Sequence, residues 1–124
     1  MKQAKDDLRV ISKAIDLIEH TIQLTSNCNK FPKKYRFTLC DRMQNKAMTA
    51  YEFLLEANRT PLSCKSKRYE LQTKAIWNCD ELLTYIKICL DLKIIESSSA
   101  EHWSKLVSDI KFMTIKWRTT DKER

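Results

Sequence analysis

Apolar residues recur at intervals of three and four in four blocks of the chain, the spacing that gathers them on one face of an α-helix. The first block ends at the turn-rich stretch 27–29, and its apolar stripe is Leu8, Ile11, Ile15, Ile18 and Ile22. The second block begins after Pro32 and closes at Pro61, because proline cannot continue the hydrogen-bond ladder of a helix. Its stripe is Phe37, Cys40, Met43, Ala47, Tyr51, Leu54 and Asn58.

The third block begins near Ser66 and fades at 94–96, with a stripe formed by Ile76, Cys79, Leu83, Ile86 and Leu90. Ser98 and Glu101 have the spacing of a capping box at the start of the fourth block. A heptad seam follows, and from it we predict burial of Trp103, Ile110 and Trp117, with Leu106 and Met113 between them. Short connections favour antiparallel neighbours, so the pattern predicts one all-α domain, residues 1–124, folded as an up-down-up-down four-helix bundle.

Three blocks carry apolar residues beyond these stripes. Trp77, Ile88, Leu92 and Ile95 lie roughly opposite Cys79 and Ile86 at about 100° per residue, and Phe112 and Ile115 face away from Ile110. The first block adds Val10, Ala14, Leu17 and Leu24 beside its main stripe. Such stripes often mark an interface, although a wide core face with a few exposed side chains is the alternative. We therefore predict a homo-oligomer with interface residues Trp77, Ile88, Leu92, Phe112 and Ile115.

The composition excludes several classes of nucleotide site. The 124 residues include no glycine. A phosphate-cradling P-loop and a dinucleotide fingerprint both need glycine for close backbone approach, so neither is present. The net charge of +7 favours anionic partners such as nucleic acid, an acidic protein or a membrane surface, although many small basic proteins bind none of them.

The expected topology gathers most of the positive charge at the two ends of the bundle. The first pole is defined as residues 1–12, 56–70 and 111–124. It carries twelve basic and six acidic side chains. Residues 26–42, here called the second pole, carry five basic and one acidic. Such clusters can neutralise phosphates, or they can simply be solvated helix ends. The candidate nucleic-acid-binding residues are Lys65, Lys67, Arg68, Lys116 and Arg118 at the first pole and Lys33, Lys34 and Arg36 at the second.

No residue pattern indicates catalysis, a metal site or a cofactor. His20 and His102 have no ligand partner at metal-binding spacing. Of the five cysteines, Cys40, Cys79 and Cys89 lie on or near core stripes, where cysteine acts as a small hydrophobe. The polar segment 1–9 and the absence of a long apolar run predict a cytoplasmic protein with free thiols and no membrane partner.

Three short segments carry a resemblance to a known family. They are the run Phe31-Pro32-Lys33-Lys34-Tyr35-Arg36-Phe37-Thr38-Leu39, the pair Asp41-Arg42 and the run Leu54-Leu55-Glu56-Ala57-Asn58. Together they resemble the accessory variability determinant (Avd) family of diversity-generating retroelements. That family belongs with the four-helix-bundle proteins encoded in intervening sequences of 23S ribosomal RNA genes. The resemblance is sharpest over 31–58. Cys40 stands where family members commonly have glycine, so we expect this helix crossing to pack differently here.

The resemblance implies a non-catalytic subunit that forms a homopentamer, binds the retroelement's reverse transcriptase together with DNA or RNA, and supports mutagenic retrohoming. Two other hypotheses stay open. One is an RNA-associated protein of the ribosomal intervening-sequence type, and the other is an oligomeric scaffold with no nucleic-acid partner. The gene neighbourhood distinguishes the retroelement subunit from the protein of the ribosomal intervening-sequence type. Salt-dependent binding to nucleic acid distinguishes both of these from the scaffold.

Overall fold

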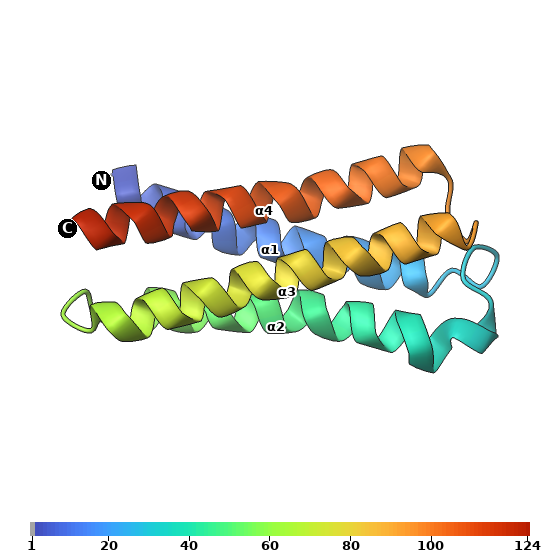
Figure 1. Cartoon of the computed structure of the whole chain (residues 1–124), viewed down its shortest axis with the longest axis horizontal. Coiled ribbons are helices and arrows are strands. Elements are labelled where there is room, and N and C mark those ends of the chain that lie inside the picture. The colour runs from blue at the N-terminus through green and yellow to red at the C-terminus, as the bar shows by residue number, and fades with distance from the viewer. Residues whose placement is uncertain (1) are drawn as a thin grey trace.

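The computed structural model describes residues 2–124, with side chains described from Arg9 onward, and it confirms an all-α bundle of four helices. The helices are α1 (Lys2–Thr25), α2 (Asp41–Arg59), α3 (Lys65–Asp91) and α4 (Ser97–Glu123). Each packs against its neighbours in sequence, and α1 closes the bundle against α4. The helices run antiparallel, so the start of α1, the α2–α3 connection and the end of α4 share one end of the bundle (Figure 1).

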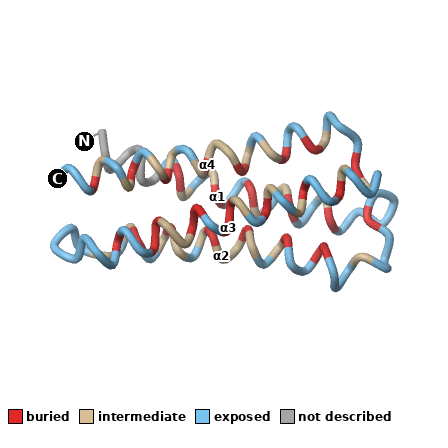
Figure 2. Tube along the Cα trace, in the orientation of Figure 1, coloured by how far each residue is buried: buried red, intermediate tan, exposed pale blue. Residues whose placement is uncertain are grey.

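A single hydrophobic core runs along the bundle between the four helices (Figure 2). The predicted seam of α4 is confirmed, because Trp103, Ile110 and Trp117 are all buried. Val107 and Thr114 are buried between them, whereas Leu106 and Met113 flank the core half-exposed. The Trp103 indole also donates a hydrogen bond from Nε1 to the Thr21 hydroxyl at 3.1 Å, which joins α4 to α1 inside the core.

The prediction of which face of α1 points into the core is wrong, because the buried positions precede the predicted ones by about one residue. The buried side chains are Val10, Ala14, Leu17, Thr21 and Thr25, the set that includes three residues assigned to the side of the stripe. Ile15 is 43% exposed and Ile22 is also exposed, while Leu8 lies outside the described side chains. The small Ala14 and the hydroxyl of Thr21 face the core because Trp103 fills that space and needs a hydrogen-bond acceptor.

The segment before α2 departs from a regular α-helix. A 3₁₀ turn, η1 (Lys33–Tyr35), leads into a π-helical turn, η2 (Arg36–Cys40). A π turn holds an extra residue, so it rotates side chains away from the positions that α-helical spacing assigns. Phe37, predicted on the core stripe, is consequently 75% exposed, whereas Leu39 and Cys40 are buried. From Cys40 onward the predicted stripe of α2 is regular, with Met43, Ala47 and Leu54 buried.

The α3–α4 connection reverses the chain without glycine. Lys93 has φ of 61°, the left-handed conformation that usually needs glycine. The Lys93 N–H bonds to the Leu90 carbonyl and the Ile94 N–H to the Cys89 carbonyl, at 3.0 and 2.9 Å. This pair of bonds is a Schellman motif, which satisfies carbonyls at the end of α3.

The start of α4 and the apolar character of the helices are also relevant to the predictions from the sequence. The capping box predicted at Ser98 is wrong, because α4 begins at Ser97 after an extended Glu96, and no side chain caps its first turn. None of the helices described is both long and apolar enough to cross a membrane.

Candidate nucleic-acid interface

The first pole brings together the α2–α3 connection, the start of α3 and the end of α4 (Figure 1). Lys65, Lys67 and Lys116 are exposed there, and Arg118 is half-buried. Arg118 lies over the Tyr69 ring, with its guanidinium carbon 5.0 Å from the ring centroid, and its Nη1 donates to the Thr73 hydroxyl at 3.0 Å. These contacts hold one cation in place on an aromatic ring, whereas the lysines stay free to move in solvent.

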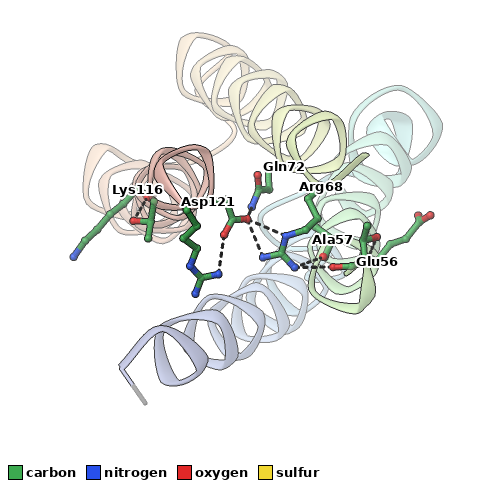
Figure 3. A network of polar contacts seen from close by, with 9 residues as sticks. Glu56, Ala57, Arg68, Gln72, Lys116 and Asp121 are labelled. Atoms are coloured by element: carbon green, nitrogen blue, oxygen red, sulfur yellow. Dashed lines mark hydrogen bonds and ion pairs between the residues drawn. The ribbon is translucent and has the colours of Figure 1, made fainter. Parts of the chain in front are cut away.

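Arg68, expected on the surface of this pole, is only 5% exposed. Its Nε and Nη2 donate to Oδ2 of Asp121 at 3.0 and 2.8 Å, and its Nη1 donates to the carbonyls of Ala57 and Thr60 (Figure 3). All of the charge on Arg68 is therefore directed into the protein. Arg68 is therefore a structural residue that ties three helices together rather than a surface cation, and the exposed candidates for phosphate contacts at this pole are its neighbours.

An open pocket of about 360 Å³ lies between the first turns of α3 and the last turns of α4. Lys65, Arg118 and Lys122 line it together with the Tyr69 ring. Asp121 also borders the pocket, but its carboxylate accepts hydrogen bonds from Arg68, from Gln72 Nε2 at 2.8 Å and from Arg124 at 3.3 Å. Because that carboxylate is already neutralised, the pocket carries a net positive charge.

Glu70 is an acidic residue of the first pole that forms an ion pair with Lys74. A hydrogen bond from Lys74 to Glu70 at 3.0 Å, with the charges of Lys74 and Lys67, holds the pKa of Glu70 below its ordinary value. Glu70 therefore stays ionised beside Lys67.

The second pole presents a different basic surface. Lys33 and Lys34 on η1 and Arg36 on η2 are all exposed, and Lys34 Nζ lies 5.1 Å from the centroid of the Tyr35 ring. A smaller pocket of about 200 Å³ is lined in part by Lys33 and Arg36. The buried Phe31 and Leu39 anchor both ends of this segment in the core, so its cations face outward.

The second apolar face of α3 is two patches rather than one stripe. Trp77 is 58% exposed, and Ile88 and Leu92 form a separate exposed pair about 16 Å farther along the helix at 1.5 Å per residue. Ile95, predicted beside them, is buried. On α4, Phe112 is 63% exposed and Ile115 is half-buried. All five predicted interface residues therefore reach the surface at least in part.

The described cysteines and histidines are placed as follows. Cys40, Cys79 and Cys89 are buried, as predicted, and burial raises the pKa of Cys79 and of Cys89 to about 12, which disfavours their thiolates. His20 and His102, 82 positions apart, meet across α1 and α4 with ring centroids 5.1 Å apart, a pairing that local sequence spacing does not indicate. Within the described part of the chain, no group of three or more potential metal ligands comes together.

Comparison of the chain with protein-family models, with curated proteins and with solved structures finds no match to any of them. The structure by itself establishes an all-α protein with four helices in sequential antiparallel contact. The resemblance to a family consequently rests on residues 31–58, and the candidate surface rests on the arrangement of charge at the two poles.

Proposed function

We propose that this protein is a non-catalytic accessory subunit of a diversity-generating retroelement. In this role it assembles as a homo-oligomer, with five copies as the choice taken from the Avd family. It binds the element's reverse transcriptase together with template RNA or cDNA. The observation that carries the proposal is the Phe31–Leu39 run on a four-helix bundle, where it forms an exposed basic corner anchored by buried residues at both ends.

The distribution of charge supports the nucleic-acid part of the proposal. The first pole offers Lys65, Lys67, Lys116 and Arg118, and the second offers Lys33, Lys34 and Arg36. A ring of subunits would repeat either pole around its axis, which multiplies the field of a single copy. Because few aromatic rings accompany these cations, phosphate contacts dominate and the binding is tolerant of sequence.

The test is fluorescence anisotropy with labelled single-stranded DNA and RNA at several salt concentrations. Wild-type affinity for both should fall steeply as salt increases, because bound phosphates release counterions. Charge reversal at Lys65, Lys67 and Lys116 to glutamate should weaken binding of DNA and RNA alike. Arg68 is left unchanged in this variant, because its loss would unfold the pole rather than test its surface.

The matched control reverses the same number of charges outside both sets of candidate residues, at Lys13, Lys87 and Lys105. This control should retain most of the wild-type affinity. A second triple variant at Lys33, Lys34 and Arg36 measures the contribution of the other pole. If the wild type binds neither nucleic acid at low salt, the scaffold hypothesis stands and this proposal is wrong.

The reverse-transcriptase part needs a separate experiment. A reverse transcriptase gene beside the gene for this chain, and co-purification of the two proteins, would support the proposal. A location inside a ribosomal RNA gene would instead favour the intervening-sequence type of protein.

A further inference from the structure

The pocket at the first pole has the features of a site for one nucleotide rather than for a uniform stretch of backbone. Its volume of about 360 Å³ lies near the lower limit of small-ligand pockets. Cations stand on both sides, Lys65 from α3 and Arg118 and Lys122 from α4, and one wall is an aromatic ring. From this arrangement we infer that the pocket binds a nucleoside monophosphate unit, with the phosphate between the cations and the base against Tyr69 and Arg118.

The phosphate half of the site rests on positive charge that the acidic residue lining the pocket does not cancel. Asp121 is the acidic residue that lines the pocket, and Arg68, Gln72 and Arg124 saturate its oxygens. Lys65 and Lys122 form no ion pair in the described part of the chain, so both can turn toward a ligand.

The start of α3 adds a second source of positive potential. Cys64 precedes the helix, and its side chain makes no capping hydrogen bond to the backbone N–H groups of the first turn. Lys65 and Ser66 in that turn line the pocket, so the start of the helix lies at the edge of the pocket. Backbone N–H groups at a helix start favour anions, and a dianionic terminal phosphate gains more from them than a singly charged diester does.

The ring half of the site rests on the Tyr69–Arg118 pair. Tyr69 is 46% exposed although Arg118 lies over its ring, so part of the aromatic surface stays open. The bond from Arg118 to Thr73 fixes the guanidinium plane before any ligand arrives. A flat base can stack on this prearranged pair, and stacking accepts every base because each has a π-face.

This inference rests on the proposed function for its biological source, because a nucleic-acid-binding subunit meets phosphorylated strand ends. The chemistry is shared by free nucleotides and by such ends. Isothermal titration with AMP, adenosine and inorganic phosphate tests the pocket alone. Short DNA strands with a 5′-phosphate, a 3′-phosphate or hydroxyls at both ends then separate the two sources.

AMP should bind saturably at millimolar concentration or below, and adenosine or phosphate alone should bind at least about tenfold more weakly, since each occupies half of the site. Tyr69→Leu and Lys122→Gln should each weaken AMP binding severalfold, and Tyr69→Phe should retain it. The matched control is Lys34→Gln, which removes a lysine that lies over a tyrosine ring at the second pole and should change nothing. Circular dichroism establishes that each variant is folded.

Saturable AMP binding that depends on Tyr69 and Lys122 supports the inference, and a preference for a phosphorylated strand end assigns the natural ligand to nucleic acid. Equal affinity for all three strands assigns it to free nucleotide. No binding of AMP, or AMP binding that Tyr69→Leu and Lys122→Gln leave unchanged, overturns the inference. If AMP binds but the DNA strands do not bind at low salt, the nucleotide site is supported and the proposed function is wrong. If the strands bind in a salt-dependent manner but AMP does not bind, the proposed function is supported and the nucleotide site is wrong.

Discussion

Arg68 and Asp121, 53 positions apart, form a buried ion pair in which Nε and Nη2 of Arg68 both donate to Oδ2 of Asp121, at 3.0 and 2.8 Å. The pair joins the first turn of α3 to the last turns of α4, and the remaining bonds of Arg68 reach the end of α2 (Figure 3). Carbonyls at a helix C-terminus have no partner within the helix and favour a positive charge. One side chain therefore closes three helices at the first pole.

Replacement of Arg68 by methionine should lower the free energy of unfolding by about 3–5 kcal/mol, because it leaves the Asp121 carboxylate buried without its main partner. Chemical denaturation measures this change. Arg68→Lys should not restore stability, since an ammonium cannot make the same set of planar contacts. The exposed neighbour provides the control: Lys67→Met should change stability by less than about 0.5 kcal/mol. Equal effects at the two positions would contradict the structural role of Arg68.

Lys93→Gly should stabilise the protein by about 0.5–1 kcal/mol, although glycine usually destabilises a folded chain. The gain comes from the φ of 61° at this position, because this conformation is unfavourable for a residue with a Cβ atom and is freely accessible to glycine. Lys93→Ala is the control, because it removes the charge but keeps the Cβ atom, and it should give no such gain. A loss of stability in Lys93→Gly would show that the left-handed conformation is not strained in the native lysine.

The sequence predicts the existence of each helix well, because periodicity depends on local spacing alone. It fails where packing partners decide which way a helix faces. On α1, a stripe of isoleucines and a neighbouring stripe with Ala14 and Thr21 compete for the core, and the shape and hydrogen-bonding need of Trp103 select the second. Nothing within α1 itself contains that information.

The candidate site could also be predicted from the sequence only in part. The basic poles follow from topology and charge counts, and Lys65, Lys67, Lys116 and Arg118 do lie at one end of the bundle. The burial of Arg68 depends on Asp121, which is remote in sequence, so local pattern cannot separate Arg68 from the exposed Lys67. The π turn at Arg36–Cys40 is likewise not indicated by helical periodicity, and it places Phe37 on the surface while Leu39 and Cys40 are buried.

The His20–His102 contact should make stability depend on pH. Burial and the nearby His102 hold the pKa of His20 below its ordinary value. The unfolded chain therefore takes up a proton at His20 first as the pH falls, and stability decreases from about pH 7 downward until the folded-state pKa is reached. Unfolding curves of wild type and His20→Gln across this range measure the effect, which should be smaller in the variant. An identical pH dependence in both proteins would exclude His20 as its source.

The exposed apolar patches predict self-association through the lateral surfaces of α3 and α4. Trp77 and Phe112 are the largest of these side chains, and buried aromatic residues dominate the binding energy of interfaces. Light scattering should give several times the monomer mass of 14.7 kDa, and five times that mass is the outcome that the family resemblance implies.

Trp77→Ser and Phe112→Ser together should shift the protein toward the monomer without loss of helix content, because both side chains already face outward. The matched control replaces Phe37, which is at least as exposed but lies at the second pole, and Phe37→Ser should leave the mass unchanged if the contact is lateral. A change in mass from Phe37→Ser alone would move the interface to the η2 corner. A wild-type monomer at micromolar concentration would rule out the ring. The exposed apolar patches would then face water in each copy and would not be an interface between copies.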